Sequence, residues 1–234
     1  MTGLVYKEWK QNRWFILSMI LCGFAPLLVL LLLRGEIPNA DHTALRIGGL
    51  IAGFLASGTL QMMVLRGDDR KLWGYWITAS ADGYKGFLRV KYEMIFGMIV
   101  LFLFSLQLVD MGYCAVAADL GKTDAGSISD IAFLLGFVQI LFRATDIPFT
   151  YRFGSKKGSF IKLICMVTLA IILGAVLIFS AEHIEHIIET ARDLFSQNSS
   201  LILSVGLVVC FGLYYLSYRI TCRLYLKGVE QYDH

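Results

Sequence analysis

Long apolar stretches alternate with short polar ones along this chain. Six stretches come close to the ~20 residues that a helix rising about 1.5 Å per residue needs to cross the ~30 Å hydrocarbon layer of a bilayer. They cover residues 14–33, 47–65, 94–109, 131–150, 160–180 and 201–218. The third and sixth stretches are short but can be extended at their ends. The pattern predicts an all-α integral membrane protein with six transmembrane helices in a single domain, residues 1–234.

Two further segments have the pattern of helices that lie beside a membrane. Residues 1–13 carry Lys7, Lys10 and Arg13 among aromatic and aliphatic side chains, which predicts an N-terminal interfacial helix. Residues 181–197 repeat apolar side chains at the i, i+3, i+4, i+7 spacing of an amphipathic helix, with acidic side chains opposite. We expect this second helix on the outer surface between spans five and six, as a lid or packed on the bundle.

The composition and the charge distribution agree with a membrane protein. Hydrophobic residues make up 57% of the chain and charged residues only 17%, whereas about a quarter of the residues of a soluble domain are charged. If the N-terminus is cytosolic, the outer segments hold few basic residues, namely Arg34, Arg46, Lys122 and Arg192. Because basic residues stay on the cytosolic side, both termini are predicted to be cytosolic. The net charge of +3 reflects this asymmetry and does not indicate a nucleic-acid partner.

The second span carries small residues, Gly49, Gly53 and Ser57, at four-residue spacing. Small side chains at this spacing let two helices approach closely, and van der Waals packing holds helices together in lipid. The sequence therefore predicts a helix-packing interface here. It fits two interpretations equally well, a subunit or helix interface that moves, and ordinary tight packing.

The fourth span carries two ionisable residues, Arg143 and Asp146, three positions apart. Charged side chains inside a bilayer are costly and often functional, and this spacing lets the two pair on one face of a helix. They could form a polar contact in a transport path, a structural ion pair between helices, or a pair that reaches the cytosolic interface. The structural options are favoured.

The sequence contains no motif typical of a catalytic or metal site. The phosphate-binding GxxxxGK[ST] loop, the HExxH metal motif and the GxSxG nucleophile turn are all missing. His183 and His186 could supply two metal ligands from one helix face, but a third ligand is not evident, and a solvated polar face explains them better. Five cysteines stand singly, without a CxxC pair. We expect no catalytic residue, no metal and no cofactor bound by this chain.

Residues 66–92 form a cytosolic segment that is charged and rich in aromatic side chains. Aromatic anchors contribute much of the binding energy of protein interfaces, while charged groups set orientation. The segment therefore predicts a docking site for a cytosolic partner, made by Asp68, Asp69, Arg70, Lys71, Leu72, Trp73, Tyr75 and Trp76.

Three motifs together resemble the ABC-2-type transporter permeases. The first is the lysine-bearing N-terminal stretch Leu4-Val5-Tyr6-Lys7-Glu8, and the second is the segment Asp68 to Trp76, followed by Lys91-Tyr92. The third joins spans four and five and reads Ile147-Pro148-Phe149-Thr150-Tyr151-Arg152-Phe153-Gly154-Ser155-Lys156-Lys157-Gly158. The closest subgroup is the short permeases of peptide-toxin and bacteriocin-immunity exporters in Gram-positive bacteria.

This resemblance implies a multi-pass subunit of an ABC exporter in the bacterial cytoplasmic membrane. It implies a second permease copy, as a homodimer or heterodimer, and an ABC ATPase subunit that binds ATP and Mg and docks on residues 66–92. It also implies an amphipathic or hydrophobic substrate, with peptides first. The more polar fourth span and the acidic outer helix depart from the subgroup. Two other functions stay open, a membrane adaptor or sensor that does not transport, and an intramembrane enzyme.

Overall fold

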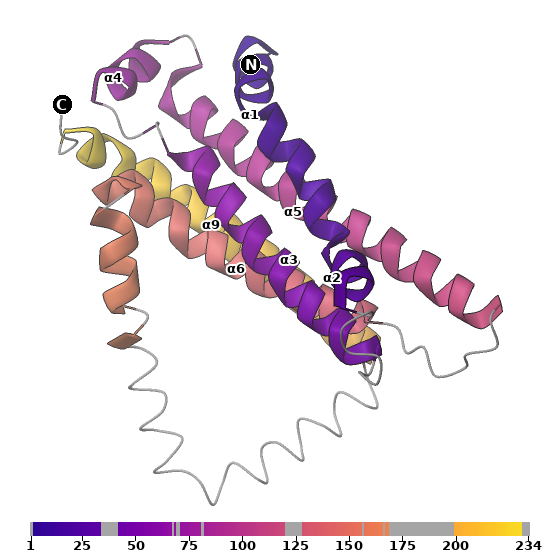
Figure 1. Cartoon of the computed structure of the whole chain (residues 1–234). Helices are drawn as coiled ribbons and strands as arrows, with labels where there is room; N and C mark the ends of the chain where they lie inside the picture. The colour runs from indigo at the N-terminus through magenta and orange to yellow at the C-terminus, as the bar shows by residue number, and fades with distance from the viewer. Residues whose placement is uncertain are drawn as a thin grey trace, which may run out of the picture.

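The computed structural model describes residues 2–33, 42–66, 68, 71–80, 82–119, 128–155, 157–165, 167–168 and 199–230. Their regular structure is entirely helical, with no strand in these ranges. In chain order the labelled helices are α1 (Thr2–Gly23), α2 (Ala25–Leu33), α3 (His42–Leu65), α4 (Lys71–Ala79), α5 (Gly83–Asp119), α6 (Ser129–Phe153) and α9 (Ser199–Val229). The long helices form an elongated bundle, and the short α4 lies at one end of it (Figure 1).

Four helices are long and apolar enough to cross a membrane: His42–Leu65, Gly83–Val116, Ser129–Phe153 and Ser204–Val229. A fifth span is present if α1 and α2, which meet at an angle of 54°, cross as one bent unit. The protein is thus a multi-pass all-helical membrane protein. The count of six stays a prediction, because most of the fifth predicted span lies outside the described residues. The predicted outer helix 181–197, with His183 and His186, lies outside them too.

The first helix differs from the expected boundaries. Residues 1–13 were expected to form a separate interfacial helix, but α1 continues without a break to Gly23. The bend comes after it, at Phe24, just before Pro26 in the first turn of α2. Proline has no backbone N–H to donate and fits best in a first turn, so the chain bends there and not at residue 13.

The helix that contains the third predicted span extends beyond residues 94–109 at both ends. Helix α5 begins at Gly83 and has 37 residues, about 55 Å at 1.5 Å per residue, which exceeds a ~30 Å hydrocarbon layer. Part of the segment 66–92 therefore belongs to α5. Gly83 has a φ of 61°, a backbone conformation that glycine adopts readily, and it makes the turn from α4 into α5.

Helix α3 lies close against α1 and α2 through the small residues of its predicted interface. A Cβ added to Gly49 would lie 2.5 Å from Pro26 Cα, and one added to Gly53 would lie 2.5 Å from the Cys22 carbonyl oxygen. Ser57 is buried and accepts a hydrogen bond from the Gln139 amide of α6. This surface is thus a tight packing contact within the chain.

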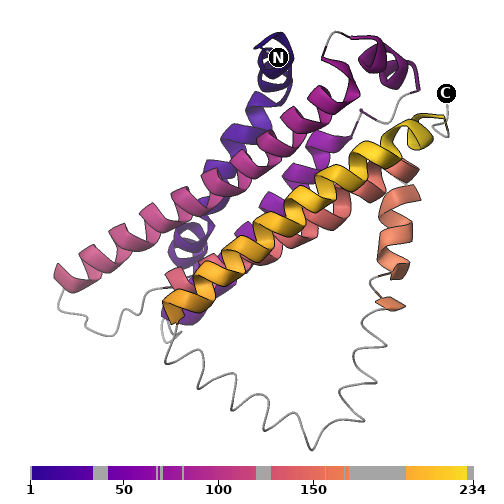
Figure 2. The same ribbon diagram turned by 180° about the vertical axis from the view of Figure 1, so that it is seen from behind.

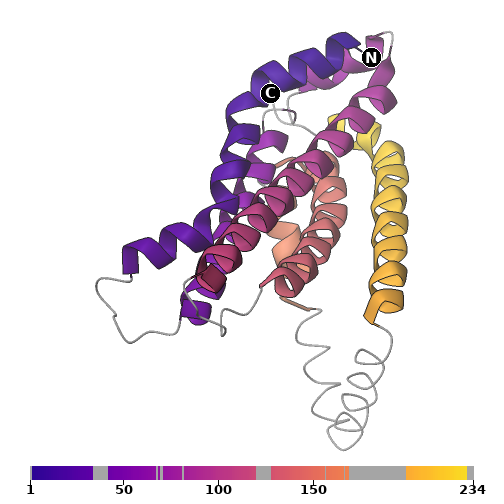
Figure 3. The same cartoon turned by 90° about the vertical axis from the view of Figure 1, so that its right-hand side faces the viewer.

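Helices α6 and α9 run side by side (Figures 1 and 2). A Cβ on Gly228 would lie 2.0 Å from the Tyr151 carbonyl oxygen, so glycine is required there. Further along, the Tyr92 hydroxyl of α5 lies 2.7 Å from the hydroxyls of Ser217 and Thr221 in α9. The start of α1, the end of α9 and α4 all lie at one end of the bundle, called here the α4 end (Figure 3).

Candidate functional site

Helix α4 has one buried and one exposed face. Its exposed face carries Leu72, Tyr75 and Trp76, with exposed fractions of 81%, 49% and 59%. Gly74 and Ile77 point inward, and a Cβ on Gly74 would lie 2.6 Å from the Val229 side chain of α9. The spacing i, i+3, i+4 puts the three exposed side chains on one stripe of the helix. They are therefore available to a partner.

Trp73 lies beside this stripe, is only partly exposed and packs against the bundle. Its ring stacks on Trp76 at 4.9 Å and meets Phe87 of α5 edge-on at 6.1 Å. The Lys7 ammonium group of α1 stands 3.6 Å from the centre of the Trp73 ring, a distance at which a cation is attracted to the ring face. Trp73 therefore joins α4 to α1 and α5 and does not belong to the exposed stripe.

An ion network at the α4 end has Lys91 at its centre. The Lys91 side chain is fully buried, and its ammonium nitrogen lies 2.7 Å from Glu8 Oε2 and 2.8 Å from Asp68 Oδ2. It also donates a hydrogen bond to the Val64 carbonyl oxygen of α3. Glu8 itself is 1% exposed and accepts a hydrogen bond from the Asn12 amide. The three acceptors, from Glu8, Asp68 and Val64, match the three N–H donors of the Lys91 ammonium group.

Asp68 connects this network to α6, because the Tyr151 hydroxyl donates a 3.0 Å hydrogen bond to Asp68 Oδ2. Burial raises the pKa of the Asp68 carboxyl, and the charge of Lys91 opposes that shift. The charged residues of the predicted docking site therefore do not form one surface. Asp68 is turned inward, Lys71 is half-exposed at the start of α4, and Asp69 and Arg70 lie outside the described residues.

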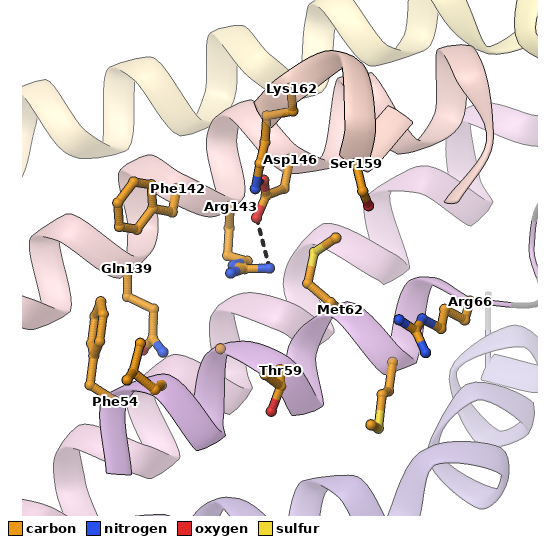
Figure 4. Close-up of a pocket in the computed structure, with 13 residues that line it drawn as sticks. Phe54, Thr59, Met62, Arg66, Gln139, Phe142, Arg143, Asp146, Ser159 and Lys162 are labelled. Atoms are coloured by element: carbon orange, nitrogen blue, oxygen red, sulfur yellow. Dashed lines mark hydrogen bonds and ion pairs between the residues drawn. The ribbon is translucent and has the colours of Figure 1, made fainter. Parts of the chain in front are cut away.

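A second polar site is a pocket of about 440 Å³ between α3, α6 and the helical residues 157–165 (Figure 4). Its apolar wall includes Phe54, Met62 and Phe142. Its polar lining includes Gln139, Thr59, Ser159, Asp146 and three cationic side chains, Arg66, Arg143 and Lys162.

The predicted pair Arg143 and Asp146 lies in this pocket. Arg143 Nη1 is 2.8 Å from Asp146 Oδ2, and the Lys162 ammonium group contacts the other carboxylate oxygen (Figure 4). The Asp146 side chain is fully buried and that of Arg143 is 9% exposed. The Arg143–Asp146 pair is thus formed within α6, and Lys162 extends it to the chain that follows α6.

The chain turns back after α6, which is why Lys162 reaches Asp146. Gly154 ends α6 with a φ of 81°, and the Gly158 N–H donates to the Gly154 carbonyl. A Cβ on Gly158 would lie 2.6 Å from the Phe149 carbonyl oxygen. The two glycines of the predicted junction motif therefore allow a sharp turn that closes the pocket.

Residues 90–226 match the family described as ABC-2 family transporter protein. The match covers more than half of the chain. The chain belongs to the ABC-2 transporter family. No curated protein and no solved structure gives a significant match.

As an ABC-2 permease, the chain is the transmembrane component of an ABC transporter, and ATP hydrolysis in general belongs to a partner subunit. The matched residues include Lys91, Tyr151 and the pocket residues of α6, whereas α4 precedes them. The resemblance to peptide-toxin exporters stays a prediction.

Glu8, Lys91 and Tyr151 were not predicted as site residues, although all three belong to the motifs that resemble the ABC-2-type permeases. Lys91 is flanked by Val90 and Tyr92 shortly before a long apolar run. Because Arg89 and Glu93 stand two positions away on either side, the sequence does not mark Lys91 as a buried lysine, a rare case that requires a paired carboxylate. Its partners were not evident, because Glu8 lies far away in the chain.

Proposed function

We propose that this permease is the membrane-spanning subunit of an ATP-driven ABC exporter that moves an amphipathic or hydrophobic substrate, with peptides as the first candidates, out of the cell. A separate ATPase subunit, which binds ATP and Mg, docks on the exposed stripe of α4 from the cytosol. The observation that carries this proposal is the two-sided character of α4. Leu72, Tyr75 and Trp76 face outward, while Trp73 and the adjacent Asp68 are tied to the bundle.

The contacts of α4 give a physical route for coupling. Asp68 stands three positions before the start of α4 and pairs with Lys91 of α5, and Lys91 also pairs with Glu8 of α1. Separating a buried charge from its partner is strongly unfavourable, so these groups are expected to move together. When ATP closes the ATPase subunits and displaces α4, the N-terminal part of α1 and the start of α5 would move with it.

The charge distribution supports a cytosolic α4 end. Most of the basic residues outside the spans lie near α4, the start of α1 and the end of α9. In this orientation the permease sits in the bacterial cytoplasmic membrane and works with a second permease copy. The pocket between α3 and α6 then opens near the cytosolic half of the bundle.

Association with the ATPase tests this proposal. We expect the double variant Leu72→Asp with Trp76→Ala to lose co-purification of the ATPase by at least about tenfold, since aromatic anchors dominate such interfaces. Trp73 is avoided because it packs on Phe87 and its loss would disturb α4 itself. The matched control is Trp14→Ala, a tryptophan on α1 that is also mostly exposed, 67% against 59% for Trp76. Full retention of the ATPase by the double variant would contradict the assigned dock.

ATP turnover of the complex in lipid tests the transport part. An exporter of amphipathic peptides is expected to hydrolyse ATP faster when such a peptide is added, and vanadate is expected to inhibit this turnover. An adaptor that only recruits the ATPase would bind it without that stimulation, and this result would contradict export.

A further inference from the structure

We propose that the pocket between α3 and α6 binds an amphiphile with an anionic head group, a phosphate or a carboxylate. The head group would lie among Arg143, Lys162 and Arg66, and the apolar part would lie along Phe54 and Met62. This goes beyond the transport role, because it assigns a ligand class to the permease chain alone.

The charges of the pocket are unequal. Arg143 and Lys162 both pair with one carboxylate, that of Asp146, and Arg66 adds a further positive charge to the lining. One carboxylate neutralises only one of these cations. Arg66 is exposed, but Arg143 is buried and Lys162 partly buried, and both share that one carboxylate. Excess charge in such a largely apolar setting is costly unless a counter-ion is present. An anion in the pocket would supply that counter-charge.

Arg143 also has unused hydrogen-bonding capacity. Its Nε atom is buried and has no hydrogen-bond partner in the part of the chain that the structure describes. Buried donors without partners are rare in proteins. A guanidinium group is well suited to the oxygens of phosphate and carboxylate, to which it can donate two parallel hydrogen bonds.

The remaining lining explains why the ligand is an amphiphile and not a free anion. The lining also includes the apolar residues Phe54, Leu55, Met62, Met63 and Phe142, and Figure 4 shows Phe54, Met62 and Phe142 around the charged side chains. The volume of about 440 Å³ lies in the range of small-molecule pockets. Methionine side chains adapt to apolar groups of irregular shape. The wall therefore suits a flexible hydrocarbon body.

The test measures which amphiphiles stay bound to the purified permease, without any ATPase, in native mass spectrometry. The probes are phosphatidylglycerol, dodecyl phosphate, zwitterionic phosphatidylcholine and inorganic phosphate. We expect anionic amphiphiles to be retained about tenfold better than phosphatidylcholine, since charge-assisted contacts distinguish them. The better retained of the two anionic probes identifies a two-chain bilayer lipid or a single-chain molecule as the source.

Two variants place the site. Thr59→Glu adds a negative charge to the lining without replacing any residue of the ion pairs, and we expect it to abolish the preference for anions. Thr145→Glu is the matched control, because Thr145 is also exposed and bonded only to a carbonyl of its own helix turn, but lies outside the pocket. Equal thermal unfolding midpoints of the two variants show that both are folded.

Three results would overturn the proposal. The first is equal retention of phosphatidylglycerol and phosphatidylcholine by the unaltered chain. The second is an unchanged anion preference in a folded Thr59→Glu variant. The third is displacement of the amphiphile by inorganic phosphate at the same concentration, because the apolar wall would then contribute nothing. None of these results bears on ATPase docking, which is measured separately.

Discussion

At the scale of single residues, Lys91 has the most demanding environment in the described chain. Its ammonium group is fully buried between the carboxylates of Glu8 and Asp68, at 2.7 and 2.8 Å. Bringing charges out of water is costly, and the pairs offset that cost only while every partner is in place. Lys91 therefore holds α1, α5 and the segment before α4 in one arrangement.

Replacing Lys91 by methionine is expected to destabilise the permease by about 3–5 kcal/mol, because two carboxylates would stay buried without their cation. The measurement is the thermal unfolding midpoint of the purified chain. The control is Arg89→Met, which removes an exposed pair with Glu93 and is expected to change stability by less than about 1 kcal/mol. Similar midpoints for the two variants would contradict a central role of Lys91.

At the scale of secondary-structure elements, the sequence predicted what depends on local pattern and missed what depends on distant contacts. The long apolar runs located α3, α5, α6 and α9, since crossing a bilayer requires them. The segment rich in tryptophan was predicted to dock a partner, and it forms the separate helix α4. The inward position of Asp68 was not predictable, because it depends on Lys91 and Tyr151 from other helices.

The boundaries were missed for a related reason. Lys7, Lys10 and Arg13 suggested that an interfacial helix ends at residue 13, yet charge alone does not end a helix. Helix α1 continues to Gly23 because the first strong break is the one before Pro26. The place of Lys162 in the pocket was not predicted either. Its side chain reaches Asp146 only because the chain turns back at Gly154.

The packing of α3 gives a prediction at this scale. Gly53→Ala is expected to lower stability by about 1–3 kcal/mol, because the added methyl group would overlap the Cys22 carbonyl of α1. Gly48→Ala lies in the same helix with nothing within 4 Å of the added atom. Alanine is the better helix former, so this control is expected to be neutral or slightly stabilising. Equal losses of thermal stability in both variants would contradict tight packing at Gly53.

At the scale of the whole molecule, the network around Lys91 and the pocket around Arg143 lie in one apolar bundle and serve different purposes. The network around Lys91 is balanced within the chain, since Lys91 pairs with Glu8 and Asp68 and Lys7 pairs with Glu8 as well. The pocket around Arg143 has a volume of about 440 Å³, and its lining carries more cations than carboxylates. The first site connects α4 to the long helices, and the second is where an anionic amphiphile is proposed to bind.

The most direct test of the central claim is photo-cross-linking in the intact complex with its ATPase, in lipid. A photoreactive amino acid replaces Trp76 on the exposed stripe of α4 or, as the control, Trp14 on α1. The proposed dock predicts a covalent permease–ATPase product from position 76 and none from position 14. A product from position 14 alone would contradict it and place the ATPase on another surface.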